Sequence, residues 1–207
     1  MSATIETTPV EFELPLLPKG DPCVMVIFGA TGDLTRRKLM PALFRLMCEG
    51  CLDDVQILCV GRSPITDPEF RKMVREALNA SEKVEHCSDE NWDRFTSRIT
   101  YFAGELDSDA TYSGIASRLD DLVKAGASTN SLFYFATPPS LSPTIVEGLG
   151  KANLAKRPQG WSRIVVEKPF GRDLESAKKL NAEIATVFQE DQVYRIDHYL
   201  GKDTVQN

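Results

Sequence analysis

Six short apolar runs recur along the chain, each followed by a polar or glycine-containing turn. They lie at 23–28, 55–60, 99–103, 131–136 and 163–166, and around Tyr194. Continuous apolar runs of this length are typical of strands that are buried on both faces of a parallel sheet. Helical segments separate the runs, and this alternation indicates helices on both faces of the sheet. The pattern therefore predicts an α/β fold with a doubly wound, Rossmann-like parallel sheet of about six strands.

Apolar residues at helical spacing mark the segments between these runs. We expect helices after Lys38 and within 68–80, 88–97, 110–124, 143–153 and 174–189. Asp67 and Asp173 are the expected N-caps of the helices that follow them. Pro41 lies inside the first predicted helix, so that helix either begins near Pro41 or is kinked there.

The chain of 207 residues suits one large domain and is short for two. Prolines interrupt residues 1–22, so we expect an N-terminal tail there and a single domain over 23–207. The formal net charge of −6, with no long basic block, disfavours nucleic acid as a partner. No apolar run is long enough to cross a bilayer, and the acidic tail does not resemble a targeting signal. We therefore expect a cytoplasmic protein.

Five cysteines, an odd number, suggest reduced thiols. Cys48 and Cys51 have the spacing of a zinc or redox motif, but a second pair of ligands is missing. We expect no metal, and we interpret the motif as the end of a helix at Gly50. Metal binding or redox chemistry remains the alternative.

The first apolar run leads directly into Gly29-Ala30-Thr31-Gly32-Asp33-Leu34. Glycines permit a tight turn and a close approach of the backbone to a ligand, and the N-terminus of the next helix can hold phosphate. Arg36, Arg37 and Lys38 add positive charge nearby. The spacing differs from GxGxxG, so a plain strand-to-helix turn is the alternative.

The second run ends in Gly61-Arg62-Ser63 and carries no carboxylate at this position. An acidic residue there binds the ribose of NAD, whereas an arginine suits the 2′-phosphate of NADP. The segment therefore favours NADP, with an ordinary surface arginine as the alternative.

The exits of the fourth and fifth runs also carry candidate chemistry. Thr137-Pro138-Pro139 forces an extended exit on the ligand side of the sheet. Glu167-Lys168-Pro169 places a charged pair at the carboxyl end of the fifth strand. Lys168 could bind a substrate hydroxyl or the cofactor. Pro169 is a candidate for a cis peptide bond. A salt-bridged loop is the alternative.

The densest polar segment is Arg195-Ile196-Asp197-His198-Tyr199-Leu200-Gly201-Lys202, which follows the last predicted strand. Three of its side chains can donate hydrogen bonds to a small anion: His198, Tyr199 and Lys202. A solvated helix start with a satisfied histidine is the alternative for any one of them.

Four segments together resemble the glucose-6-phosphate dehydrogenase family. They are residues 29–34 with Lys38, then 61–63, 167–171 and 195–202, in the order of the family. The octapeptide at 195–202 is the most specific of them. The similarity extends from about residue 23 to the last residue.

The resemblance implies a function and a set of site residues. The reaction would be the oxidation of glucose 6-phosphate to 6-phosphoglucono-lactone by hydride transfer to NADP, the first step of the oxidative pentose phosphate pathway. The implied cofactor-binding residues are Gly29, Ala30, Thr31, Gly32, Asp33, Leu34, Thr35, Arg36, Arg62, Tyr134 and Lys168. The implied substrate-binding residues are Lys38, Lys168, His198, Tyr199 and Lys202. Asp197 would orient a catalytic base that lies beyond residue 207.

Family members are more than twice as long, so the resemblance implies that their C-terminal domain, which forms the subunit interface, is absent here. We therefore expect this chain alone to bind NADP weakly and to be inactive, and the full-length protein to be a homo-oligomer. By chemistry alone His198 would be the candidate base, whereas the resemblance makes it a phosphate ligand. An NADP-dependent oxidoreductase of another sugar and a non-catalytic NADP-binding module remain alternatives.

Overall fold

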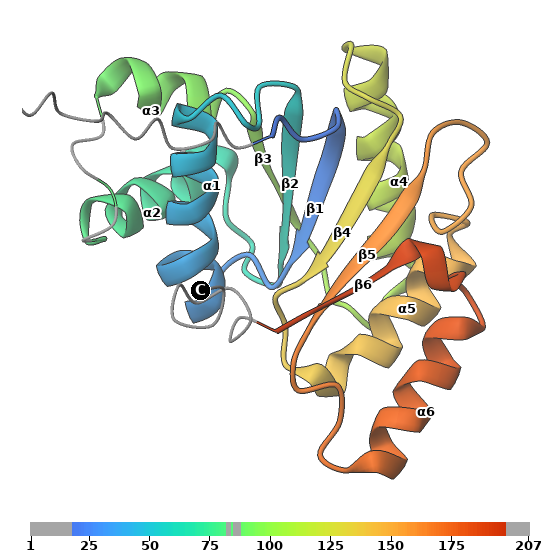
Figure 1. The fold of residues 1–207 in the computed structure, drawn as a ribbon. Coiled ribbons are helices and arrows are strands. Elements are labelled where there is room, and N and C mark those ends of the chain that lie inside the picture. Colours follow the sequence, from blue (N-terminus) through green and yellow to red (C-terminus); the bar gives the residue numbers. More distant parts are fainter. Residues whose placement is uncertain (1–17, 82–83, 85–87, 198–207) are drawn as a thin grey trace, which may run out of the picture.

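A computed structural model of the protein describes residues 18–81, 84 and 88–197. Its strands form one parallel sheet with the order β3-β2-β1-β4-β5-β6 (Figure 1). Their bounds are β1 Cys23–Phe28, β2 Val55–Gly61, β3 Ile99–Ala103, β4 Ser131–Phe135, β5 Ser162–Glu167 and β6 Val193–Ile196. In the register, Val26 of β1 lies opposite Leu58 of β2 and Phe133 of β4. The predicted six-stranded, doubly wound sheet is confirmed.

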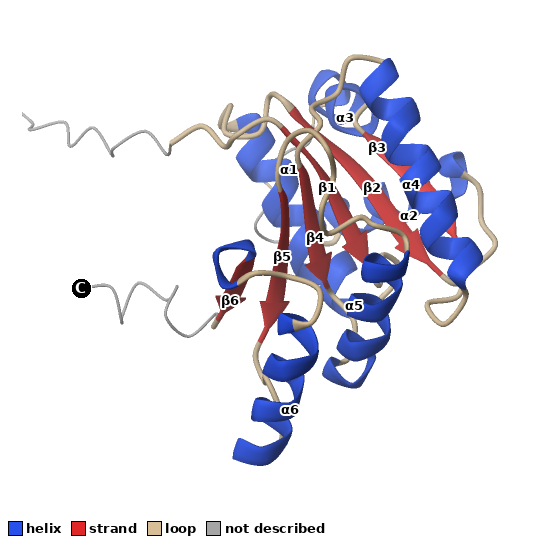
Figure 2. Ribbon diagram, turned by 90° about the vertical axis from the view of Figure 1, so that its right-hand side faces the viewer, coloured by secondary structure: helices blue, strands red, loops and turns tan. Residues whose placement is uncertain are grey.

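Helices cover the two faces of the sheet in two groups (Figures 1 and 2). One face carries α1 (Met40–Cys48), α2 (Asp67–Asn79) and α3 (Asp89–Thr96). The other face carries α4 (Asp109–Lys124), α5 (Ser142–Lys151) and α6 (Leu174–Ala185). Among the helices of the described residues, none has the length and apolarity that a membrane span requires.

Two apolar layers hold these helices to the sheet. Side chains alternate between the faces of a strand, so the continuous apolar run of β1 supplies both layers. Val24, Val26 and Phe28 pack toward α4, α5 and α6, while Cys23 and Ile27 pack toward α1, α2 and α3. Full burial of each such aliphatic or aromatic side chain stabilises the fold by about 1.5–3 kcal/mol.

The helix N-caps follow the prediction at one helix and differ at another. Asp173 caps α6, but α6 ends at Ala185 and a 3₁₀ turn, Glu190–Gln192, precedes β6. The N-cap of α2 is Thr66, where Asp67 was expected, because Thr66 and Glu69 form a reciprocal capping box. The Asp67 carboxylate instead accepts a hydrogen bond from the backbone N–H of Tyr101 at 2.6 Å. A tertiary contact thus takes the expected cap residue away from its own helix.

Pro41 lies in the first turn of α1, which settles the alternatives for this helix. A π-helical turn, Thr35–Leu39, comes first, and the N–H of Met40 donates to the carbonyl of Thr35. The hydrogen bonds change here from π-helical to α-helical spacing. Proline has no backbone N–H, so Pro41 leaves no unpaired donor at this change. The regular helix therefore begins at Met40.

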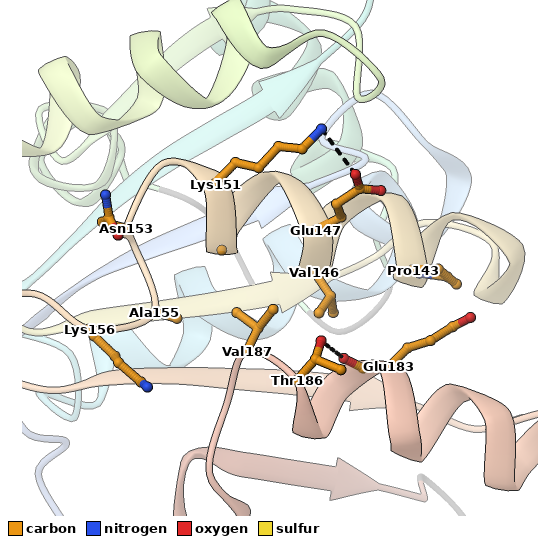
Figure 3. Close-up of a pocket in the computed structure, with 11 residues that line it drawn as sticks. Pro143, Val146, Glu147, Lys151, Asn153, Ala155, Lys156, Glu183, Thr186 and Val187 are labelled. Atoms are coloured by element: carbon orange, nitrogen blue, oxygen red, sulfur yellow. Dashed lines mark hydrogen bonds and ion pairs between the residues drawn. The ribbon is translucent and has the colours of Figure 1, made fainter.

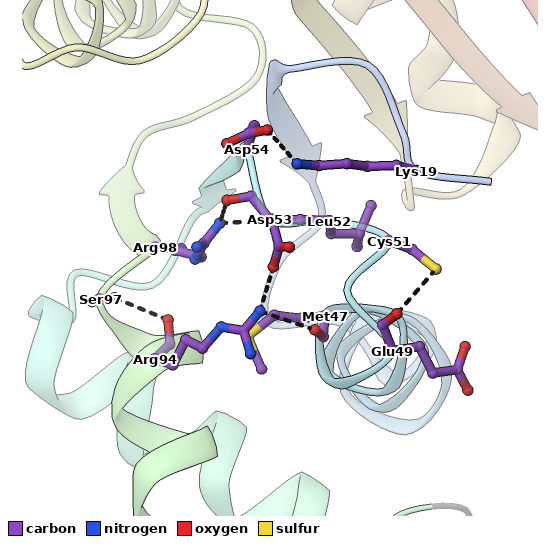
Figure 4. Close-up of polar contacts among 10 residues, drawn as sticks. All are labelled: Lys19, Met47, Glu49, Cys51, Leu52, Asp53, Asp54, Arg94, Ser97 and Arg98. Carbon is purple, nitrogen blue, oxygen red and sulfur yellow. Dashed lines mark hydrogen bonds and ion pairs between the residues drawn. The ribbon is translucent and has the colours of Figure 1, made fainter. Parts of the chain in front are cut away.

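The amino edge of the sheet is held by a polar network near the end of α1 (Figure 4). Gly50 has φ +78° and ends α1, as the sequence predicts; Cys48 is exposed and Cys51 is buried. Although Cys48 as a residue is exposed, partial burial of its thiol raises the pKa of that group, which disfavours a reactive thiolate. Arg98 donates to the carbonyls of Leu52 and Asp53. These contacts fix the loops that precede β2 and β3, at the opposite end of the strands from the predicted ligand side.

Candidate functional site

A cavity of about 560 Å³ lies at the carboxyl edge of the sheet. The turn after β1 supplies Gly29, Thr31 and Gly32 to its wall, and the end of β2 supplies Gly61 and Arg62. Parallel strands all end at this edge, so residues from distant parts of the sequence meet there. Open α/β sheets bind ligands in this position, where the strand order reverses between β1 and β4.

Gly29 occupies a place that no other residue can fill without strain. Its φ is +86°, and a Cβ added there would lie 2.7 Å from the carbonyl oxygen of Ala136. Ala136 is held in turn, because its N–H donates to the carbonyl of Phe28 at 3.0 Å. The first turn therefore passes directly against the exit of β4, and both segments line the cavity.

Hydrogen bonds within the protein hold the turn in shape. The N–H groups of Gly29 and Ala30 both donate to the carbonyl of Val60 at 3.0 Å, and the N–H of Gly32 donates to Gly29. The hydroxyl of Thr35, which is fully buried, donates to the carbonyl of Gly29 at 2.9 Å. Ala30 and Thr35 thus shape the turn and do not line the cavity among the described residues.

Arg62 lies on the cavity wall with an exposed side chain. No described residue forms a hydrogen bond or an ion pair with its guanidinium group. A planar guanidinium group with free donors is suited to the two oxygens of a phosphate. The end of β2 therefore presents a positive charge to the cavity that no described residue neutralises.

Another part of the cavity wall comes from residues that the sequence did not mark as candidates. Glu105, Leu106 and Asp107 follow β3, and Leu141 and Thr144 lie at the start of α5. The rule that ligands bind at strand carboxyl ends, applied to the third run, would have marked 104–107 as candidates. The end of β2 carries no carboxylate, but Glu105 and Asp107 bring two acidic groups to the cavity from the exit of β3.

Thr137 provides a test of whether a polar ligand fits this cavity. It lines the wall at the exit of β4, and its hydroxyl oxygen is buried without a hydrogen-bond partner among the described residues. A buried polar atom without a partner costs about 1–3 kcal/mol, and a bound hydroxyl or phosphate group would remove that cost. The glycine cradle, the free arginine and this hydroxyl together fit a nucleotide.

A second group of polar residues lies at the ends of β5 and β6. The Lys168 ammonium group is 3.0 Å from the carboxylate of Asp197, and the Lys168 N–H donates to the carbonyl of Ile196. The Lys168-Pro169 peptide bond is cis, as the sequence suggested. The sheet thus brings together two residues that are 29 positions apart in the sequence.

Tyr134 faces the layer of α1, α2 and α3, and its hydroxyl donates to the carboxylate of Glu167. Burial, followed by this contact, raises the pKa of Tyr134 well above its usual value, so the phenol keeps its proton. Tyr134 does not line the described cavity. Its hydrogen-bond partner, Glu167, directly precedes Lys168 in the sequence.

The remaining predicted residues lie outside the cavity or outside the described part of the chain. Asp33 and Arg37 form an exposed ion pair at 3.6 Å on the turn that leads to α1. Leu34, Arg36 and Lys38 are on the same turn, and none lines the cavity among the described residues. His198, Tyr199 and Lys202 fall outside the described residues.

A cavity of similar volume, about 570 Å³, lies between α5 and α6 (Figure 3). Val146 and Val187 form part of its floor, and Lys151 on its rim pairs with Glu147 at 2.9 Å. It lies on the outer helices and contains neither the glycine turn nor a strand end. The cavity at the carboxyl edge, which has both the glycine turn and strand ends, is therefore the better candidate.

Comparison with known proteins gives consistent results. Residues 26–207 match the family model described as "Glucose-6-phosphate dehydrogenase, NAD binding domain". The chain is 45% identical over 193 residues to Glucose-6-phosphate 1-dehydrogenase of Chlamydia pneumoniae, with 90% of this chain and 37% of that protein covered. It is 42% identical over 202 residues to Glucose-6-phosphate 1-dehydrogenase 5, cytoplasmic, of Arabidopsis thaliana, covering 88% and 37%.

Solved structures agree with this match. The crystal structure of Glucose-6-phosphate 1-dehydrogenase from Mycobacterium avium superimposes with a TM-score of 0.77 at 39% identity, covering 87% of this chain and 36% of that one. A glucose-6-phosphate dehydrogenase in complex with its substrate glucose-6-phosphate gives 0.79 at 35% identity, covering 92% and 39%. The chain therefore spans well under half the length of the relatives that it matches.

Proposed function

Because this chain belongs to the glucose-6-phosphate dehydrogenase family, we propose that it is the cofactor-binding part of an enzyme that oxidises glucose 6-phosphate to 6-phosphoglucono-lactone. The observation that carries the proposal is the cavity at the carboxyl edge, where the turn at Gly29 and the free side chain of Arg62 meet. The cofactor that we propose is NADP, bound with its pyrophosphate over residues 29–36 and its 2′-phosphate at Arg62.

The choice of NADP depends on the balance of charge in the cavity. Arg62 has no partner among the described residues, so a phosphate dianion would gain a charge-assisted hydrogen bond there. Glu105 and Asp107 reach the same cavity from the exit of β3 and would instead suit the ribose hydroxyl groups of NAD. Both carboxylates are exposed, so solvent screens their repulsion of a phosphate more than it would for buried groups.

The chemical step requires a hydride acceptor and a base. Bound NADP would supply the acceptor for the hydride that leaves C1 of the sugar. A general base must take the C1 hydroxyl proton at the same time. The described residues include no histidine, and we propose that Asp197 orients a base that lies beyond residue 207. The ammonium group of Lys168 would hold the sugar between Asp197 and the cofactor.

We also propose that Lys38, His198, Tyr199 and Lys202 bind the sugar phosphate, and that Tyr134 supports the cofactor site through Glu167. The proposed location is the cytoplasm, which is supported by the name of the Arabidopsis thaliana relative. We expect the full-length protein to be a homo-oligomer through segments that this chain does not cover.

The test is an absorbance assay for NADPH with the natural full-length protein. We expect NADPH to form with glucose 6-phosphate and NADP, and to form far more slowly with unphosphorylated glucose. Faster turnover of another sugar would favour a different sugar oxidoreductase. Binding of NADP without turnover of any sugar phosphate would refute the proposed reaction and favour a non-catalytic module.

A further inference from the structure

The hydroxyl group of Tyr101 lies under the turn that carries Arg62. Tyr101 is in β3, opposite Cys59 of β2, and only 5% of it is exposed. Its hydroxyl passes the last residue of β2 and donates to the carbonyl oxygen of Ser63 at 2.8 Å. The same carbonyl accepts the N–H of Ile65 at 2.8 Å, so it is the fixed point of the turn.

The Tyr101 ring is held in place independently of that turn. The ring of Phe70 stacks on it, with centroids 4.8 Å apart and an interplanar angle of 25°. The backbone N–H of Tyr101 donates a hydrogen bond to the carboxylate of Asp67, at the start of α2. A Cβ on Gly61 would lie 2.7 Å from the Tyr101 hydroxyl oxygen, so the missing side chain of Gly61 opens the passage to Ser63.

We propose that Tyr101 is a positioning residue that sets the preference for NADP over NAD by holding the Arg62-Ser63 turn. This inference rests on the proposed role of Arg62 as the ligand of the 2′-phosphate. The Arg62 side chain has no partner among the described residues, so its direction depends on the backbone that carries it. The hydrogen bond from Tyr101 fixes that backbone at the next residue. NAD lacks the 2′-phosphate, so its binding should not depend on this bond.

The chain offers a matched control in Tyr112. Its hydroxyl donates to the carbonyl of Leu106 at 2.7 Å and lies 3.4 Å from the carbonyl of Thr144, and both residues line the same cavity. Tyr112 is also buried, but it has no contact with the turn at Arg62 among the described residues. Loss of the Tyr112 hydroxyl should alter a part of the cavity wall that contacts NADP and NAD alike.

The experiment measures the dissociation constants of NADP and NAD for the full-length protein by titration calorimetry. We expect Tyr101→Phe to weaken NADP binding about 3- to 10-fold, the usual worth of one hydrogen bond, and to leave NAD binding unchanged. Tyr112→Phe should change both constants by the same factor. In a background of Arg62→Ala, Tyr101→Phe should have no further effect on the ratio of the two constants.

A second variant covers the case in which Tyr101→Phe does not fold. Phe70→Leu removes the ring that stacks on Tyr101 but keeps the hydroxyl, and it should shift the ratio in the same direction. The preference for NADP could be lost in Arg62→Ala but unchanged in the folded Tyr101 or Phe70 variant. That result would refute the role of Tyr101 and leave the role of Arg62 standing. Equal affinity for both cofactors in the natural protein, or a ratio that does not respond to Arg62→Ala, would refute the proposed role of Arg62 as well.

Discussion

Replacement of Gly29 by alanine tests the close approach on which the cavity depends. The substitution adds one methyl group at φ +86°, a region that costs a non-glycine residue about 1–2 kcal/mol. The methyl carbon would also lie 2.7 Å from the oxygen and 3.0 Å from the carbon of the Ala136 carbonyl. These are backbone atoms in a bonded segment, so they cannot turn away as the end of a flexible side chain could.

Overpacking of this kind costs about 1–3 kcal/mol in addition to the backbone strain. We therefore expect Gly29→Ala to lower the free energy of unfolding by about 2–5 kcal/mol in total. A shift of the β4 exit would relieve part of the overlap, but it would displace Thr137 at the cavity wall. Cofactor affinity should fall with stability. The assay is urea unfolding, with the free energy taken from the midpoint and the slope, together with a cofactor titration.

Gly126 is the matched control for this experiment. It follows α4 with φ +99°, and an added Cβ would meet nothing within 4 Å. Gly126→Ala should therefore show the backbone strain without the overlap and lose about 1 kcal/mol, part of the strain being offset by the stiffer unfolded chain. It should leave cofactor affinity unchanged. Equal losses of stability in the two variants would show that the contact between Gly29 and Ala136 has no energetic weight.

Three further results are expected. Arg62→Ala should weaken NADP binding about 10- to 100-fold, as for a hydrogen bond to a charged group, and barely change NAD binding; equal losses would exclude a contact with the 2′-phosphate. Lys168→Ala should raise KM for glucose 6-phosphate and lower kcat while stability changes by less than about 1 kcal/mol, because its ion pair with Asp197 is partly exposed; steady-state kinetics and thermal unfolding separate the two effects. Burial raises the pKa of Tyr112 and Tyr134 above the usual value of 10.0, so the folded state holds these protons more tightly than the unfolded chain. The free energy of unfolding should then fall as the pH rises through 10, by up to about 1.4 kcal/mol per pH unit for each phenol, in addition to the fall above pH 9.0 that the buried thiols of Cys23 and Cys59 contribute because burial raises their pKa as well; Tyr134→Phe should reduce the slope above pH 10, and an unchanged slope would contradict the assignment.

The strands, the glycine turn and the position of Arg62 could be predicted from the sequence because each depends on local pattern. A continuous apolar run such as 23–28 has only one good solution in an alternating α/β chain, a strand buried on both faces. Gly50 and Asp173 likewise ended and began helices as predicted, because capping involves residues close in sequence. The order of the motifs along the chain was sufficient to indicate the family.

Tertiary contacts decided the features that depend on residues far apart in sequence. Asp67 does not cap α2, because its carboxylate binds the Tyr101 backbone of a neighbouring strand, and Thr66 takes the cap. The wall at Glu105 and Asp107 became part of the cavity only when strand order placed β3 next to β2. The alternation of side chains along a strand gives the face to which Tyr134 points, but only the pairing of β4 with β5 brings its hydroxyl to Glu167. Sequence periodicity determines which residues are buried, whereas the pairing of strands determines which buried and polar groups meet, since each pairing is selected by the packing of the whole sheet.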